Sequence, residues 1–508
     1  MLKFWRNPLL ILYVRSELRP ARAAITAAIT LVICILIGMG CWSADLDHRQ
    51  AFLHDLYAWL VGIQFVVLGV WSAGTCGQAV ARERELRTFD FLKTTRLTAA
   101  ELMIGKLLGA PIVAYFIVVC TLPISILAGL LGGVAPVAVL GAVVLLVFFN
   151  LFYSLAALWG SMLVEKASSG AVGLMALLAN LLALAFMDSP FKGIAAISVV
   201  SALFSLHGLR QFDVGRIAPT LFGKEVPCFI LTLVLYVLLG AWFVLMLVRN
   251  LKRDLSQIQV LSRWQCVGLI AFWNLLFYAF LDTQRIMALS RLQPSPGSYP
   301  NHAYEIATFA VAWNAFFLFL IGVAALSPPE KLKVWWRNWK SGKALYLAPN
   351  GLPWPWLVPA AVIACGMLAA EALGLRSSVP ISTWRLGFVG VAFLAFLIFT
   401  ARDVLFLQWC LLTRMKHPVT KGVLFLVFYY SAAGIIGAVA GVFSDGATWK
   451  AIAVLTPYAW FGEIENPRAN PAIDLTALVL QLAFCILIHV AIQKRLARPA
   501  HIAEASAA

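Results

Sequence analysis

The side chains best suited to chemistry lie near the C-terminal end, in the stretch FGEIENPRANPAID at residues 461–474. Its three carboxylates, Glu463, Glu465 and Asp474, have the residue type that acts as a general acid or base. Acidic residues gathered at a membrane surface would suit an enzyme acting on a lipid-linked sugar or a phospholipid. The simpler interpretation, which we favour, is that the stretch is a solvated outer loop.

Other patterns that carry catalysis or energy conversion are missing from the sequence. There is no GxxxxGK[ST] nucleotide-binding loop, because KSGKAL at residues 340–345 lacks the hydroxyl residue and the upstream glycine. HExxH and GxSxG are absent as well. The nine cysteines are spaced singly, which indicates small apolar core residues rather than metal ligands. We therefore expect no catalytic residue, no metal and no directly bound cofactor.

The composition is that of an integral membrane protein. Charged residues make up 12% of the 508 residues, about half of the roughly 25% that is usual in soluble proteins. The mean hydropathy is +0.88, and the apolar runs are long enough for spanning helices rather than barrel strands. We expect an all-α fold with about twelve transmembrane helices, at residues 23–42, 57–78, 108–130, 135–164, 169–187, 227–248, 264–281, 305–326, 356–374, 384–400, 422–442 and 474–492.

The basic residues predict the orientation in the membrane. The net charge is +16, but most Lys and Arg residues fall on one side when both termini are placed in the cytoplasm, as the positive-inside rule expects. The charge therefore indicates topology and attraction to anionic lipid, not nucleic-acid binding. The same rule favours an outer re-entrant segment at 191–208, because a span there would place Arg249, Lys252 and Arg253 outside.

The charged strip RNLKRDLSQIQVLSR at residues 249–263 divides the predicted spans into two sets of six. We expect a first membrane half at residues 1–255 and a second, more diverged half at 256–508. The two halves share no clear sequence, so the similar counts do not establish an internal repeat.

Two surface helices are predicted. In NPLLILYVRSELRPAR, residues 7–22, Asn7 can cap the helix, and Arg15, Arg19 and Arg22 fall on one stripe. This pattern is typical of an amphipathic helix on the inner leaflet, although a basic flank without such a role is the alternative. In EKLKVWWRNWK, residues 330–340, the tryptophans oppose the basic residues, which predicts an interfacial anchor formed by Trp335, Trp336 and Trp339.

The predicted spans are nearly free of charge, and an ion-driven transporter usually keeps buried ionisable residues as a relay. The polar residues inside the spans are better interpreted as interhelical hydrogen bonds than as substrate contacts: Gln64, Asn150, Asn180, Asn274, Asn314 and Gln481. The plan of a transporter without an ATP site or an ion relay indicates that energy comes from a separate subunit.

The stretch at residues 81–109, ARERELRTFDFLKTTRLTAAELMIGKLLG, is dense in charge between two apolar segments. Residues 81–97 predict a short cytoplasmic helix, in which Glu83 and Arg87 form an i, i+4 pair. Leu86 and Phe89 begin an apolar stripe that would suit a groove on a partner protein. A solvated loop with positive-inside arginines is the alternative on physical grounds alone.

This stretch resembles the hallmark loop of ABC-2-type permeases, the membrane subunits of one class of ABC exporter. The matching residues are Arg82, Glu83, Arg84, Glu85, Thr88, Asp90, Leu92, Thr94, Thr95, Leu97, Thr98, Glu101, Gly105 and Lys106. The family's glycine is Arg87 here and its proline is Arg96. Because both changes remove a backbone breaker, we expect the helix to run on further than in the family. The N-terminal helix is similar to the family's elbow helix, and residues 221–254 are similar to its last span with a basic tail.

The resemblance covers residues 1–255 and implies a function. The chain would be the permease subunit of an ATP-driven exporter in a bacterial cytoplasmic (inner) membrane, and a separate ABC ATPase would bind ATP. The coupling loop would dock that ATPase through Glu83, Glu85, Leu86, Arg87, Phe89 and Asp90. The pathway would come from one chain, from a homodimer or from pairing with a second permease. A membrane enzyme and a regulatory membrane subunit that moves no cargo remain the alternatives.

Residues 401–430 are similar to the C-terminal part of longer bacterial members of the family. We expect their charges, Arg402, Asp403, Arg414 and Lys416, to face the cytoplasm.

Overall fold

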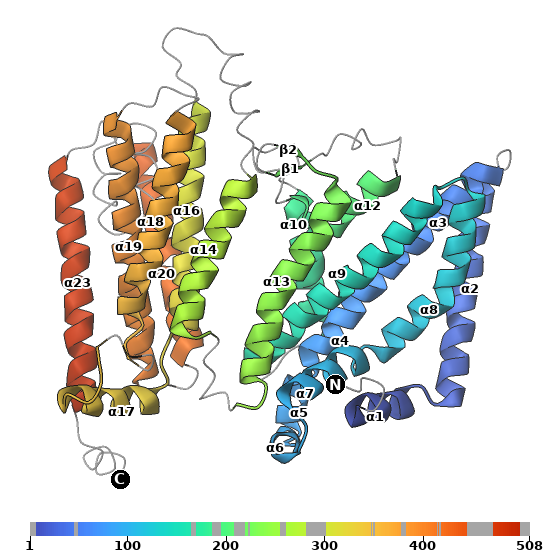
Figure 1. Ribbon diagram of the computed structural model, residues 1–508, viewed down its shortest axis with the longest axis horizontal. Helices are drawn as coiled ribbons and strands as arrows, with labels where there is room; N and C mark the ends of the chain where they lie inside the picture. Colours follow the sequence, from blue (N-terminus) through green and yellow to red (C-terminus); the bar gives the residue numbers. More distant parts are fainter. Residues whose placement is uncertain are drawn as a thin grey trace, which may run out of the picture. The chain divides into compact units, whose positions relative to one another are not determined.

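The computed structural model describes residues 7–44, 49–163, 169–184, 195–207, 219–221, 224–253, 261–280, 301–346, 348, 351–376, 383–413, 415, 418–443 and 471–497. These residues are almost entirely helical, as Figure 1 shows. The chain forms two compact units, one of which is Met1–Leu255, while the other holds nearly all of the chain from Ser256 onward. The boundary falls in the charged strip at 249–263.

Unit 1 is a helical unit with one short hairpin. Its elements are α1 Pro8–Glu17, α2 Pro20–Ala44, α3 Arg49–Val66, the π-helix η2 Val67–Ser72, α4 Ala73–Gln78, α5 Ala81–Glu85, α6 Phe89–Thr94, α7 Ala99–Gly109, α8 Ile112–Leu131, α9 Pro136–Leu163, α10 Ser169–Leu184, α12 Val199–His207, β1 Thr220–Leu221, β2 Lys224–Glu225 and α13 Cys228–Asn250. The strands β1 and β2 pair antiparallel. At its centre α9 packs on α4 and α13, where Phe152 stacks on Tyr236 with ring centroids 5.0 Å apart.

Unit 2 consists of helices in its described part. They are α14 Arg263–Phe280, α16 Asn301–Ala324, α17 Pro329–Lys340, α18 Trp354–Arg376, α19 Thr383–Leu411, α20 Pro418–Phe443 and α23 Pro471–Ala497. Helix α19 packs on α16, α18, α20 and α23 and so forms the centre of the unit.

Seven helices in the described residues are long and apolar enough to cross a membrane, or eight if the bent pair α16 and α17 counts as one span. The chain is therefore a multi-pass helical membrane protein by this measure. A helix lies at each of the twelve predicted ranges, but α10, for example, has only 16 residues. Helix α12, in the predicted re-entrant segment, has nine residues and is too short to cross a hydrocarbon core of about 30 Å.

Polar side chains inside the helices mostly join neighbouring helices, as predicted. Gln64 on α3 donates to Thr121 and Ser125 on α8, both at 3.1 Å. Asn150 on α9 donates to the Tyr115 hydroxyl on α8 at 3.1 Å. Further cases are Val199 N–H on Asn180 and Arg402 on Gln481. Asn274 instead donates to the carbonyl of Ile270 within its own helix.

The predicted surface helix at 7–22 is shorter than expected. Helix α1 begins at Pro8 with the Asn7 side chain accepting from Leu9 N–H, as predicted, but it ends at Glu17. Pro20 then starts α2, and the residue before a proline is biased away from helical geometry. Of the three arginines, only Arg15 lies on α1, whereas Arg22 lies in the first turns of α2.

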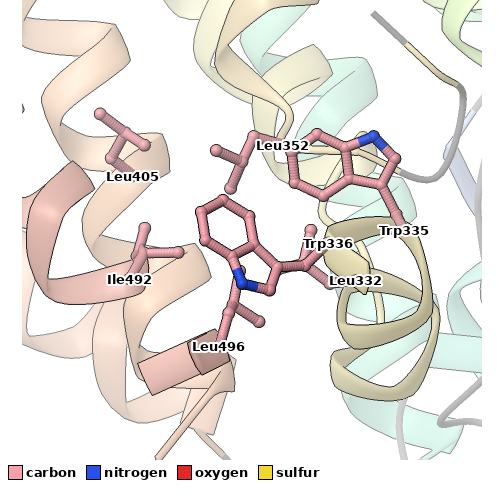
Figure 2. Packing of buried hydrophobic residues seen from close by; sticks show 7 residues of the cluster. All are labelled: Leu332, Trp335, Trp336, Leu352, Leu405, Ile492 and Leu496. Atoms are coloured by element: carbon pink, nitrogen blue, oxygen red, sulfur yellow. The ribbon is translucent and has the colours of Figure 1, made fainter. Parts of the chain in front are cut away.

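Helix α17 is amphipathic and lies nearly perpendicular to the end of α16, at an angle of 86°. Its Leu332, Trp335 and Trp336 are buried and pack on Leu405, Ile492 and other side chains of unit 2, as Figure 2 shows. The perpendicular course suits a helix in the membrane surface. However, the indole rings of Trp335 and Trp336 contact the protein's own core rather than lipid.

Arg402 and Asp403, which we expected to face the cytoplasm, are instead buried inside unit 2. Both lie within the candidate span Gly390–Leu411 of α19, with exposed fractions of 8% and 4%. Arg402 donates to Asp403 Oδ1 from Nε at 2.9 Å and from Nη2 at 2.7 Å. Tyr430 on α20 donates to Asp403 at 2.5 Å, and Gln481 on α23 accepts from Arg402 at 2.8 Å. The spans are therefore not free of charge, because this pair joins three helices of unit 2.

Candidate functional site

The candidate site is the stretch 81–106, whose helices α5, α6 and α7 lie with α1 at one end of unit 1 (Figure 1). The single helix predicted for 81–97 is instead two short helices, α5 and α6, with a turn at residues 86–88. The loss of the family's glycine therefore did not lengthen the helix.

The turn has the geometry of a Schellman motif. Thr88 N–H donates to Glu83 O at 2.9 Å and Arg87 N–H donates to Arg84 O at 3.0 Å. Arg87 adopts a φ of 57°, in the left-handed region, and no other non-glycine residue in the described part of the chain has a positive φ. Glycine is the preferred residue at this position of the motif. Arg87 thus occupies, at a conformational cost, the position at which the ABC-2 loop carries glycine.

Glu83 pairs with Lys106 on α7 rather than with Arg87. The Lys106 side chain is 1% exposed, and that of Glu83 is 19% exposed. Lys106 Nζ also donates to Ala79 O at 3.2 Å. Burial lowers the pKa of the Lys106 ammonium, and the carboxylate of Glu83 opposes this shift. A predicted docking residue is therefore part of an internal ion pair that ties α5 to α7.

The loop is also fixed to the end of α9. The Ser161 hydroxyl accepts hydrogen bonds from Val80 N–H at 3.1 Å and Ala81 N–H at 3.0 Å. Arg84 donates to the Met162 carbonyl at 2.6 Å, which satisfies a carbonyl at a helix C-terminus. These contacts hold α5 in place by both its backbone and a side chain.

Two further motif residues explain how α7 begins. Thr98 caps α7, and Thr98 and Glu101 form a capping box, with Thr98 N–H donating to Glu101 Oε2 at 2.8 Å. The spacing S/T-x-x-E is the sequence signature of this arrangement. The capping box could therefore have been recognised from the sequence, and these two residues have a structural role.

Helix α7 packs closely on α1 through glycines. A Cβ atom on Gly105 would lie 2.8 Å from Leu9 Cβ, and one on Gly109 would lie 2.3 Å from Tyr13 Cδ2. Asn7 Nδ2 donates to Glu101 O at 2.7 Å. The N-terminal helix is thus joined to the loop, a contact that spacing alone did not predict.

The surface that the loop offers differs from the predicted one. Phe89 is 3% exposed and lies under the Arg84 guanidinium at 5.0 Å, so its ring is not offered to a partner. Leu86 is 62% exposed and Phe91 is 73% exposed. Phe91 was missed because the prediction assumed one continuous helix. Around the turn between α5 and α6 the exposed residues are Arg82, Glu85, Leu86, Arg87, Thr88, Asp90 and Phe91.

Three other groups of residues are candidates for a site: the carboxylates at 461–474, the tryptophans of α17 and any side chains that could bind a metal ion. Residues 461–470, with Glu463 and Glu465, lie outside the described residues, and Asp474 lies on α23. Trp339 packs on the cluster that Trp335 and Trp336 join. The described residues contain no group of three His, Cys, Asp or Glu side chains that could hold a metal ion.

Comparison with known protein families, curated proteins and solved structures finds no match for this chain. The resemblance to ABC-2-type permeases therefore stays a prediction from the sequence.

Proposed function

We propose that the chain is the permease subunit of an ATP-driven exporter and that a separate ATPase docks on the loop at 81–106. The observation that carries the proposal is a pair of exposed apolar side chains, Leu86 and Phe91, beside the acidic Glu85 and Asp90. Apolar anchors within a charged surround are typical of protein interfaces. The hydrogen bonds to Ser161 and Met162 would let a push on α5 reach the spanning helix α9.

The buried pair Arg402–Asp403 is fully hydrogen-bonded within unit 2. Both carboxylate oxygens of Asp403 accept hydrogen bonds, from Arg402 and from Tyr430. These hydrogen bonds link α19 to α20, and Arg402 links it to α23 through Gln481. We therefore assign the pair to helix packing in unit 2 and keep the separate ATPase as the energy source.

The test is purification of the chain from its native membranes in mild detergent, with identification of stoichiometric partners and an ATP hydrolysis assay. The variants Leu86→Glu and Phe91→Glu should each lose the ATPase by more than about tenfold in affinity, which is the effect of losing an interface anchor. Leu345→Glu is the matched control. Leu345 is also an exposed apolar residue, and it follows the turn after α17. Glu83→Lys is unsuitable because it would disrupt the internal pair with Lys106.

Loss of the partner in both loop variants, with normal membrane insertion and a normal Leu345→Glu control, would support the proposal. Absence of any ATPase, under conditions that preserve a known ABC complex, would refute it. The membrane-enzyme alternative would then come first, and turnover of lipid-linked sugars by the purified chain would test it. ATPase binding without transport in reconstituted vesicles would instead indicate a regulatory subunit.

A further inference from the structure

A lateral groove in unit 1 lies between α2, α3 and α8. Its volume is about 270 Å³, and its lining is largely aliphatic, with Ile33, Leu60 and Ile117 as examples. Pockets for drug-sized ligands are larger, about 300–1,000 Å³. A helix of a second copy, about 10 Å across with its side chains, is also too thick for it. The groove therefore suits a slender apolar ligand.

The three threonine hydroxyls of the lining already have hydrogen-bond partners within the protein. Thr26 and Thr30 donate to the carbonyls of Arg22 and Thr26 on their own helix, at 2.9 and 2.8 Å. Thr121 donates to Val118 O at 3.0 Å and accepts from Gln64. Because these hydroxyls already donate to backbone carbonyls and the rest of the lining is mostly aliphatic, hydrocarbon fits the groove best.

The length of the groove matches one leaflet. Its lining on α2 extends from Thr26 to Ile37, which corresponds to roughly 16 Å at a rise of about 1.5 Å per residue. The hydrocarbon core of a bilayer is about 30 Å thick. The groove thus has the depth of a single acyl chain.

A basic residue stands at the end of the groove nearest α1. Arg22 precedes Thr26 by four residues and Ile29 by seven, so it lies on the helix face that lines the groove. Arg22 and the neighbouring Arg19 are exposed. The ion pair between Arg22 and Glu17 is long, at 3.6 Å, and the two side chains are 63% and 45% exposed. Glu17 therefore competes only weakly with a lipid phosphate for the Arg22 guanidinium.

We propose that this groove binds one acyl chain of an anionic phospholipid from the leaflet on the side of α1, with Arg22 on the lipid phosphate. The site does not depend on the docking of an ATPase. Among the described helices, α2 packs mainly on α3 and α8. A bound lipid would hold α2 against these two helices.

The experiment is native mass spectrometry of the purified chain during titration with phosphatidylglycerol or with phosphatidylcholine of the same chain length. The wild type should bind one phosphatidylglycerol about fivefold more tightly than phosphatidylcholine, which is the contribution of one arginine at a membrane surface. Arg22→Gln should abolish this preference. Arg337→Gln, which removes an exposed arginine from α17, is the control and should retain it.

Filling the groove tests the acyl-chain part of the site. Ile33→Trp should weaken the binding of both lipids, whereas Leu31→Trp should not, because Leu31 is exposed on another face of α2. Ile29→Trp replaces Ile33→Trp if that variant does not fold, since Ile29 also lines the groove.

Equal affinity of the wild type for the two lipids would overturn the proposal, as would equal effects of Arg22→Gln and Arg337→Gln. A dimer that Ile33→Trp dissociates without changing lipid binding would show that a second copy covers the groove, and it would also overturn the proposal.

Discussion

The ion pair between Glu83 and Lys106 offers the sharpest test of how the loop is held. Glu83→Gln removes the carboxylate and leaves the Lys106 ammonium buried, with Ala79 O as an acceptor. Removing one partner of a buried pair typically costs about 3–5 kcal/mol. The partial exposure of Glu83 points to the lower end, about 3 kcal/mol. Because burial already lowers the pKa of Lys106, loss of its proton would limit the cost further.

The measurement is thermal unfolding in detergent. For a unit of about this size, 1 kcal/mol shifts Tm by roughly 2–4 °C, so Glu83→Gln should lower Tm by at most roughly 6–12 °C. Glu85→Gln, on the neighbouring exposed carboxylate, should leave Tm nearly unchanged. The double variant Glu83→Gln with Lys106→Met should recover most of the loss, because it removes both charges together.

Two results would refute the reasoning. One is a Tm for Glu83→Gln equal to that of Glu85→Gln, which would mean that the pair contributes little. The other is a double variant whose loss equals the sum of the two single losses, because independent side chains add and coupled ones do not.

Three further predictions concern the loop and its supports. Arg87→Gly should raise the free energy of unfolding by about 1 kcal/mol, because glycine adopts a positive φ without cost; a lower Tm would contradict the Schellman geometry. Gly109→Ala should lower stability by about 1–3 kcal/mol through overlap with Tyr13, whereas Gly38→Ala, with nothing within 4 Å of its added Cβ, should not lower Tm in the same assay, because alanine favours a helix more than glycine does. Hydrogen bonds from Thr98 hold the pKa of Glu101 below its ordinary value of 4.5. The charged carboxylate therefore stabilises the fold above pH 4.5, and this stabilisation is lost as the pH falls through the lowered pKa. The Tm difference between wild type and Glu101→Gln should vanish in acid, and a difference that persists there would exclude the charged cap.

Much of the fold could be predicted from local pattern. The apolar runs located the helices, and Asn7 before Pro8 located the start of α1. These signals are local in the chain, because the spacing of apolar residues and the capping residues act within a few positions. The π-helix η2 at Val67–Ser72 had no such signal in the sequence; in the structure it packs against α9 and α10.

The errors at the site have a common physical origin. The expected pair Glu83–Arg87 and the expected stripe Leu86–Phe89 both assume one continuous helix. The Schellman turn at Arg87 breaks that helix, which rotates Phe89 inward and leaves Phe91 exposed. The partner that Glu83 finds instead, Lys106, lies 23 positions away, and only tertiary structure brings the two together.

The placement of Arg402 and Asp403 failed for a different reason. A hydropathy argument ends a span where charges begin, so the predicted span stopped at residue 400. In the structure α19 continues to Leu411, because the two charges neutralise each other and find Tyr430 and Gln481 on neighbouring helices.

This pair has a consequence for biosynthesis. An arginine and an aspartate at the centre of a span each cost about 2.5–3.5 kcal/mol during insertion. Since the two residues are adjacent in α19, they can enter the bilayer as a neutral pair before α20 and α23 have been synthesised. Their remaining partners arrive later, because Tyr430 and Gln481 follow in the chain on α20 and α23. The hydrogen bonds around the pair are therefore complete only after α23 has been synthesised, and truncation before Gln481 should leave Arg402 without one of its acceptors and α19 less stably inserted.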